Sequence, residues 1–255
     1  MNFLAEITGF EVTLDMRFWA MIVIVFFAGI IRGFTGFGSA LLAVPALALI
    51  YGPVQAVVIE VLIEIPVVLG LLGVSFREAE RKTVMPMLLM FVLFVPVGAF
   101  LLKITNPDYV KICISLFVLV AVAIMWQKTR FAHLFSSKAN YLVGAISGTT
   151  QGLTGMAGPL FATALLARGE SSEKTRANIT ALAAGIVLFS VISFAVLGLL
   201  TVELIFYALL ACPSILLGVW FGAVIFRRFK GIQLREVILV FLAITAILTL
   251  YLALK

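Results

Sequence analysis

The sequence of 255 residues contains few charged residues, one histidine and two cysteines. Charged residues make up 12% of the chain and hydrophobic residues 64%, which excludes a water-soluble domain of ordinary composition. Cys113 and Cys212 lie far apart within apolar runs, so they match neither a disulfide framework nor a zinc pattern. The apolar runs continue to the C-terminus, and the composition therefore predicts an all-α polytopic membrane protein.

The residue types that catalysis requires are scarce as well. The single histidine, His133, lies in a basic loop far from Ser39, and the two aspartates, Asp15 and Asp108, lie near the ends of apolar segments. An intramembrane serine or aspartyl protease would need such groups side by side. The sequence contains no phosphate-binding loop and no cluster of metal ligands. We therefore expect no enzyme, no cofactor and no metal.

The net charge of +6 does not indicate a nucleic-acid partner. The basic residues lie in short loops between apolar runs, where the orientation of a membrane protein accounts for them. The expected surroundings are therefore a lipid bilayer, and we expect no binding to nucleic acid.

Two glycine-rich motifs interrupt the apolar sequence, at residues 33–39 (GFTGFGS) and 152–159 (GLTGMAGP). Each motif follows a polar residue, Arg32 or Gln151. Hydrocarbon offers backbone groups no hydrogen-bond partner, so a break in a membrane helix must face protein or a water-filled cavity. Glycine-interrupted segments at matching places in two halves of a chain indicate the binding site of a transporter.

The two motifs also align the halves of the chain. Residues 32–36 match residues 151–155, and three full-length apolar runs follow each motif. The apolar segments beside the breaks have about ten to fifteen residues, too few to cross roughly 30 Å of hydrocarbon. We expect one membrane transport domain over residues 1–255, with a first repeat at about 17–127 and a second at about 139–254. Each repeat is expected to be a glycine-broken helical hairpin plus three transmembrane helices.

The distribution of basic residues predicts how the halves are oriented. If each broken segment returns to its own side, thirteen lysines and arginines lie on one side and four on the other. If each broken segment crosses the membrane, the distribution is nine against eight. The positive-inside rule favours the hairpins, which give each half an odd number of crossings. The repeats are then inverted, and both termini are predicted to lie outside the cytoplasm.

Arg32 is the principal candidate for binding a ligand. Its forked guanidinium suits the oxygen atoms of a sulfonate, sulfite or carboxylate, although it could instead form a structural ion pair or extend to the surface. Helix N-termini after the breaks would add free N–H groups, and hydroxyls would add donors unless they only cap helices. The predicted substrate-binding residues are Arg32, Gly33, Thr35, Gly36, Gly38, Ser39, Gln151, Gly152, Thr154, Gly155 and Gly158.

Glu60 and Glu64 are candidates for proton coupling. They are four residues apart in an apolar run and therefore share one face of a helix. Two neighbouring carboxylates repel one another when both are ionised, so one of them is suited to carry a proton. The alternative is that one neutralises Arg32 while Glu60 contacts water near a helix end. The sequence leaves these two hypotheses open.

The two motifs resemble those of the sulfite exporter TauE/SafE family. The resemblance lies in residues 33–45 (GFTGFGSALLAVP), residues 152–160 (GLTGMAGPL) and residues 175–177 (TRA), and it extends over the layout of the whole chain. It implies a multi-pass carrier of small anions, often sulfite, sulfonates or sulfoacetate, in the plasma (inner) membrane. The chain departs from the common pattern where Phe37 interrupts the first glycine run and where Leu160 replaces a frequent proline.

We therefore expect a secondary transporter of a small sulfur-containing anion that works by alternating access, with proton coupling as a further hypothesis. The alternatives are an anion channel, because paired half-helices also form selectivity filters, and a carrier of a carboxylate without sulfur. The expected partners are the anion and the bilayer, and the sequence does not fix whether the protein forms a homo-oligomer.

Overall fold

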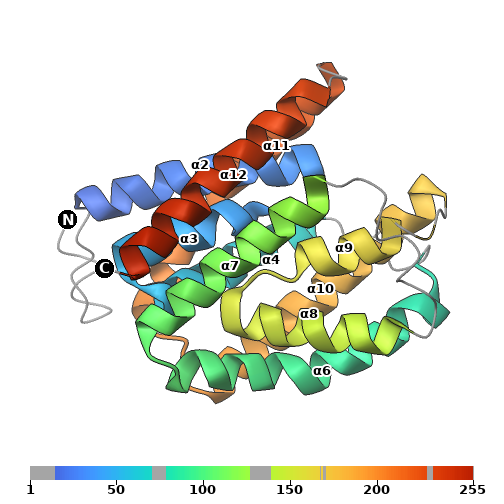
Figure 1. Ribbon diagram of the computed structural model, residues 1–255, viewed down its shortest axis with the longest axis horizontal. Helices are drawn as coiled ribbons and strands as arrows, with labels where there is room; N and C mark the ends of the chain where they lie inside the picture. The colour runs from blue at the N-terminus through green and yellow to red at the C-terminus, as the bar shows by residue number, and fades with distance from the viewer. Residues whose placement is uncertain are drawn as a thin grey trace.

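The computed structural model describes residues 15–70, 79–126, 139–166, 168, 171–228 and 232–254. This part of the chain is helical and contains no strand, which confirms the predicted all-α class. The helices of the first half are α2 (Met16–Thr35), α3 (Ser39–Tyr51), α4 (Pro53–Leu69), α6 (Arg81–Ile104) and α7 (Pro107–Trp126). Those of the second half are α8 (Asn140–Thr154), α9 (Gly158–Leu166), α10 (Ser172–Val196), α11 (Val202–Arg228) and α12 (Ile232–Ala253), and Figure 1 shows their arrangement.

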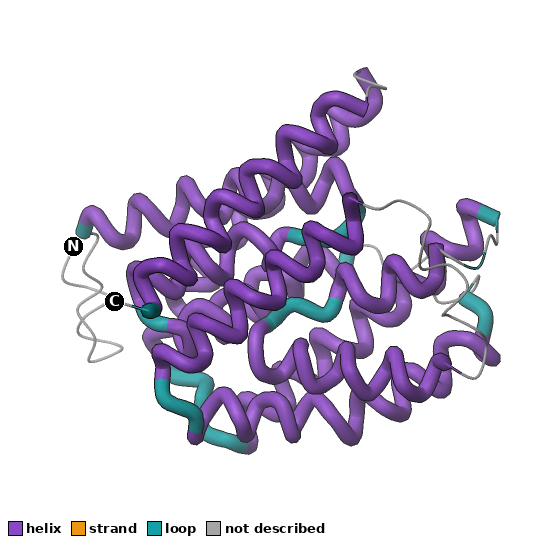
Figure 2. Tube along the Cα trace, viewed as in Figure 1, coloured by secondary structure: helices purple, strands orange, loops and turns teal. Residues whose placement is uncertain are grey.

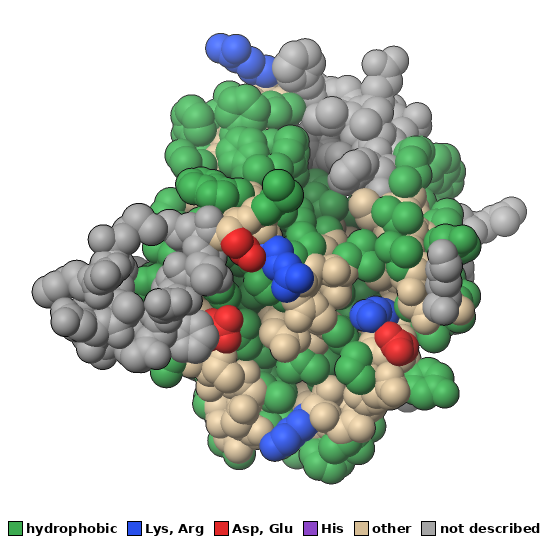
Figure 3. Space-filling view, turned by 90° about the vertical axis from the view of Figure 1, so that its left-hand side faces the viewer, with side chains coloured by type: hydrophobic (Ala, Val, Ile, Leu, Met, Phe, Trp, Pro, Cys, Tyr) green, Lys and Arg blue, Asp and Glu red, His purple; other side chains and the backbone are tan. Residues whose placement is uncertain are grey.

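Among the described residues, five helices are long and apolar enough to cross a membrane: α2, α6, α7, α10 and α11. Their outer faces carry large apolar side chains such as Leu89, Leu188 and Leu209, each of which is more than half exposed. Figure 3 shows one end of the molecule, where hydrophobic side chains cover broad areas and a few acidic and basic side chains lie among them, some side by side. Surfaces of this kind are stable in hydrocarbon and not in water, as expected of a polytopic membrane protein.

Each predicted glycine-rich break joins two helices that pack against one another, α2 with α3 and α8 with α9. Gly36 and Gly155 end the first helix of each pair in left-handed conformations, with φ of 81° and 71°. Their N–H groups donate to the carbonyls of Arg32 and Gln151, at 2.8 Å in both cases. This is a helix ending that favours glycine, because a side chain disfavours positive φ. The two motifs therefore form equivalent local structures.

The two breaks lie near the middle of the molecule. In Figure 1, α2 and α8 run towards the middle from opposite sides, and Figure 2 shows the loops that follow them there. The loops are in contact, because a Cβ atom added to Gly158 would lie 3.4 Å from the Cβ of Phe37. Segments about 120 residues apart in the sequence are thus neighbours in space.

The prediction that all four arms of the breaks are short is wrong for α2. This helix has 20 residues and would be about 30 Å long at 1.5 Å per residue, whereas α3, α8 and α9 have 13, 15 and 9 residues. Arg32 and Gly33 remain helical, because neither a polar side chain nor a single glycine is sufficient to end a helix. The helix ends only where Gly36 adopts positive φ, so the first break comprises residues 36–38.

The two halves pack against one another through two equivalent contacts. Helix α6 of the first half packs against α8 of the second, and α11 of the second half packs against α2 of the first. Glycines allow the backbones to approach closely at both contacts. A Cβ atom on Gly33 would collide with the carbonyl of Val219, and one on Gly152 would collide with the carbonyl of Val95. Two further pairs of glycines, each four residues apart, lie at the same contacts and bring the helices close together: Gly144 with Gly148, and Gly218 with Gly222.

Helix α4 occupies the centre of the fold, in contact with α3, α10 and α11. Most of its residues are buried, and the polar ones among them are Glu60 and Glu64. The core therefore places two carboxyl groups beside the first break.

Candidate functional site

Arg32 forms an ion pair at the first break. It lies in the last turn of α2, is 8% exposed, and places Nη2 3.1 Å from Oε2 of Glu64. Its Nη1 donates to the carbonyl of Gly36 at 2.8 Å. The guanidinium therefore supports the loop of the break and neutralises a carboxylate from the middle of α4. Of the alternatives for Arg32, the ion pair is present, and the buried position excludes extension to the surface.

Glu64 collects donors from two other segments. Its Oε2 pairs with Arg32 of α2, and its Oε1 accepts a hydrogen bond from the hydroxyl of Ser39, the first residue of α3. Glu64 is 8% exposed and Ser39 is 3% exposed, so both bonds are shielded from solvent. Arg32 and Ser39, two of the side chains predicted to hold an anion, thus already hold the carboxylate of Glu64.

Glu60 lies one helical turn before Glu64 and is 1% exposed. Neither of its carboxyl oxygens has a hydrogen-bond partner within the described part of the chain. The alternative in which Glu60 contacts water near a helix end is wrong, because Glu60 is buried and neighbouring helices enclose α4 on several sides. A buried polar group without a partner is costly and is characteristic of functional sites.

The second break is held by neutral groups. The side-chain oxygen of Gln151 accepts the N–H of Ala157 at 3.0 Å, which bridges this break much as Arg32 bridges the first. The hydroxyl of Thr154 donates to the carbonyl of Thr150 at 2.7 Å within α8. Gln151 and Thr154 are both buried. Among the described residues, the charged groups at the breaks therefore come from the first half.

The remaining predicted residues lie at the breaks or on helix contacts. Gly33 and Gly152 face α11 and α6, so close packing accounts for the absence of a side chain at both positions. Gly38 has a φ of 103° and precedes the first turn of α3, while Gly158 begins α9. Thr35 is the last residue of α2, and its side chain lies outside the described part.

A groove between α4 and α10 does not suit an anion. Its lining is almost entirely apolar and offers no charged donor. The residues that line it are Ile65, Val68, Leu69, Ala184, Gly185, Val187, Leu188 and Val191. An anion-binding site is better supported at the first break.

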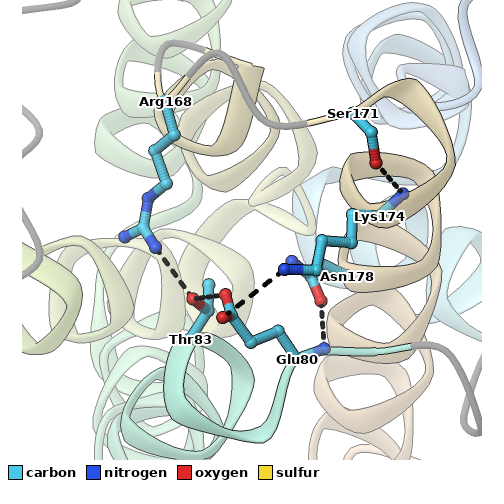
Figure 4. A network of polar contacts seen from close by, with 6 residues as sticks. All are labelled: Glu80, Thr83, Arg168, Ser171, Lys174 and Asn178. Carbon is cyan, nitrogen blue, oxygen red and sulfur yellow. Dashed lines mark hydrogen bonds and ion pairs between the residues drawn. The ribbon is translucent and has the colours of Figure 1, made fainter.

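A second polar cluster joins the start of α6 to the loop and helix after α9 (Figure 4). Arg168 donates to the hydroxyl of Thr83 at 3.0 Å, and this hydroxyl donates to the carboxylate of Glu80 at 2.8 Å. The backbone N–H of Glu80 donates to Asn178 at 2.7 Å, and Lys174 lies 3.7 Å from the Glu80 carboxylate. The cluster links the two halves of the chain through hydrogen bonds.

The cluster also affects the ionisation of Glu80. The hydrogen bond from Thr83, together with the charges of Lys174 and Arg168, holds the pKa of Glu80 below its ordinary value. The sequence did not predict this site. Asn140, the first residue of α8, is buried and accepts a second hydrogen bond from Arg168. Asn140 and the buried Asn178, in the second turn of α10, are amides in or beside apolar segments, and such amides are the signal in the sequence that could have indicated this cluster.

The described residues include no group of three or more His, Cys, Asp or Glu side chains that could hold a metal ion. His133, which the sequence places in a basic loop, lies outside the described residues.

Comparison with known proteins identifies the family of the chain. The model of the sulfite exporter TauE/SafE family matches residues 21–249, a range that contains both breaks, Glu60 and Glu64. No curated protein and no solved structure gives a match. The matched range covers nearly the whole chain, and both breaks of the resemblance are present as helix interruptions. The chain therefore belongs to the sulfite exporter TauE/SafE family.

Proposed function

We propose that this protein is a secondary transporter of a small sulfur-containing anion of the sulfite, sulfonate or sulfoacetate type across the plasma membrane. The observation that carries the proposal is the buried guanidinium of Arg32 at a helix break in a chain of a sulfite exporter family. A charged side chain inside an apolar domain is costly, and such groups usually mark the path of an ion or substrate. Arg32 is the proposed main ligand of the anion.

The other proposed ligands surround the breaks. Ser39 supplies a hydroxyl beside Arg32, and the start of α3 supplies backbone N–H groups at the positive end of the helix dipole. Gly36 and Gly38 leave the approach to these groups free of side chains. Proton coupling through Glu60 or Glu64 belongs to the same proposal, because both carboxyl groups are buried. Glu64 pairs with Arg32, and Glu60 lies one helical turn before Glu64.

The proposed mechanism is alternating access between two inverted repeats, residues 17–127 and 139–254. Two observations support this mechanism. Helices α2 and α8 run in opposite directions, and the two halves make equivalent contacts, α6 with α8 and α11 with α2. With the basic residues on the cytoplasmic side, both termini lie outside the cytoplasm. A C-terminal reporter that is active only in the cytoplasm should therefore be silent, and an active reporter would contradict this topology.

Two alternative functions differ from this proposal in a measurable way. A carrier of a carboxylate without sulfur is favoured by one observation, since Nη2 of Arg32 pairs with a carboxylate in the structure. An anion channel would show single-channel conductance, whereas a carrier shows saturable counterflow that competing substrates inhibit. Binding of carboxylates without binding of sulfur-containing anions would distinguish the carboxylate carrier from the proposed transporter. Recording of single-channel currents would distinguish the channel.

The proposal is tested by thermal stabilisation of the purified protein with sulfite, sulfonates, sulfate and simple carboxylates. A ligand at one hundred times its dissociation constant stabilises the folded protein by about 2.7 kcal/mol. The test variant is Arg32→Gln, and the matched control is Arg17→Gln, which removes an exposed arginine from the first turn of the same helix.

Stabilisation of the wild type and of Arg17→Gln by a sulfur-containing anion, without stabilisation of Arg32→Gln, would support the proposal. Stabilisation by carboxylates alone would instead establish the carboxylate carrier. An equal response of Arg32→Gln, measured on protein that still unfolds cooperatively, would show that Arg32 is not the ligand.

A further inference from the structure

The anion-binding groups of the first break are already engaged with Glu64. Arg32 and Ser39 are the cationic and hydroxyl donors proposed for the substrate, and both contact this carboxylate. We infer that Glu64 is an internal anion in the binding site, and that a substrate anion binds by displacing Glu64 from Arg32 while Glu64 takes up one proton. This inference rests on the proposed function, because it concerns the same site.

The charge balance at the site requires the proton. Arg32 and Glu64 together are neutral, so an added monovalent anion leaves one negative charge without a counterion in a buried place. A proton on Glu64 restores neutrality: the carboxylate becomes a carboxylic acid, and the N–H of Arg32 moves its hydrogen bond from Glu64 to the anion. The anion and the proton therefore enter the site together, one of each.

Glu60 has a different relation to the anion. It has no contact with Arg32 and no hydrogen-bond partner among the described residues, so an anion at Arg32 does not displace it. The charges that act on Glu60 are those of Glu64 and Arg32. A negative charge on Glu60 would repel the anion. Binding of the anion to Arg32, however, breaks the ion pair of Glu64 and no contact of Glu60.

Apart from Arg32 and Glu60, no charged group is recorded in contact with Glu64 in the described part of the chain. In the sequence, the charged residues of the helices packed against α4 fall within the first two or the last two turns of those helices: Asp108, Lys111, Glu173, Lys174, Arg176, Glu203, Arg227 and Arg228. The uncharged titratable residues of these helices are Tyr51, Tyr109, Cys113, Tyr141, Tyr207 and Cys212. The side chain that helix α3 contributes to the site is Ser39, whose hydroxyl is neutral. Because Glu64 is the carboxylate that Arg32 holds, the proton required by charge balance is assigned to Glu64.

The inference is tested by calorimetric titration of the purified protein with methanesulfonate between about pH 6 and 8. This probe stays singly charged throughout, so a change of affinity with pH reports on the protein. Repeating the titration in buffers of different ionisation enthalpy counts the protons taken up per bound anion, and this measurement needs only the wild type. Glu64→Gln removes the proton acceptor but leaves Arg32 an oxygen partner. The matched control is Glu203→Gln, in the first turn of α11.

The wild type and Glu203→Gln should take up about one proton per anion, and their dissociation constants should rise about tenfold per pH unit where Glu64 is ionised. Glu64→Gln should take up none and should bind with the same affinity at every pH. Binding to the wild type without proton uptake, or unchanged proton uptake in Glu64→Gln, would overturn the inference and leave the proposed function intact. Failure of methanesulfonate to bind any of these proteins would overturn both the sulfonate-type site and the inference.

Discussion

Breaking the Arg32–Glu64 pair should destabilise the protein by several kcal/mol. In Arg32→Met the carboxylate of Glu64 stays buried, and Ser39 is its one remaining donor among the contacts described. Removing one partner of a buried ion pair typically costs about 3–5 kcal/mol. For a chain of this size the apparent melting temperature should fall by about 10 °C. Glu64→Leu should have a similar effect, because it leaves the guanidinium of Arg32 unpaired.

The double variant Arg32→Met/Glu64→Leu separates pairing from packing. With both charges gone no buried ion is left without a partner, and apolar replacement of a buried pair is often neutral. The hydrogen bond from Arg32 to Gly36 is still lost, which costs about 1 kcal/mol. The double variant should therefore recover most of the stability that each single variant loses.

Thermal unfolding in detergent, followed by circular dichroism, measures the four proteins of this cycle, with Arg17→Met as the control for loss of an arginine from α2. The control should change stability by less than about 1 kcal/mol, because Arg17 is exposed. A double variant that is as unstable as the sum of the two single variants would show that the residues are not coupled. That result would refute the place given to Glu64 in the site.

Two further predictions concern the contacts between the halves. Gly33→Ala and Gly152→Ala should each destabilise the folded protein by about 1–3 kcal/mol in thermal unfolding, because the added Cβ collides with the backbone of a neighbouring helix. Gly70→Ala should have little effect, because a Cβ atom at this position has room. Equal effects at all three positions would contradict the packing described. Ionised Glu80 should stabilise the protein above its unfolded pKa, since its pKa is lowered in the folded state, and this contribution should be lost as the pH falls through the folded value. The melting temperature of the wild type should then exceed that of Glu80→Gln at neutral pH, and a constant difference on acidification would refute the reasoning.

The helical class and the positions of the two breaks could be predicted from the sequence because both are local properties. Apolar runs of helix length and glycines at Gly36 and Gly155 specify them without knowledge of the tertiary structure. The predicted length of α2 is too short, because a polar residue in an apolar run does not by itself end a helix. In the structure Arg32 remains helical, and its charge is compensated by a residue from another helix.

The partners of the polar residues could not be predicted, because they depend on which helices meet. Glu64 is 32 positions after Arg32, and the sequence left open whether Glu60, Glu64 or neither would pair with it. Packing of α4 in the centre decides between them, since it brings Glu64 to Arg32 and Ser39 and leaves Glu60 enclosed. The contact between the two breaks is likewise a property of the assembled halves.

This contact offers a direct test of alternating access. Arg32, Ser39 and Glu64 all belong to the first half, so movement of one half against the other need not separate them, whereas Phe37 and Gly158 belong to different halves and should separate. The distance of 3.4 Å between Cβ positions is close to the range of disulfides, so Phe37→Cys/Gly158→Cys should form a cross-link on oxidation. The background for this variant is the protein with Cys113 and Cys212 replaced by alanine, because both are free thiols. Oxidation should stop transport by the double-cysteine protein, reduction should restore it, and each single-cysteine protein should be unaffected. Undiminished transport by fully cross-linked protein would show that the halves do not separate at the breaks.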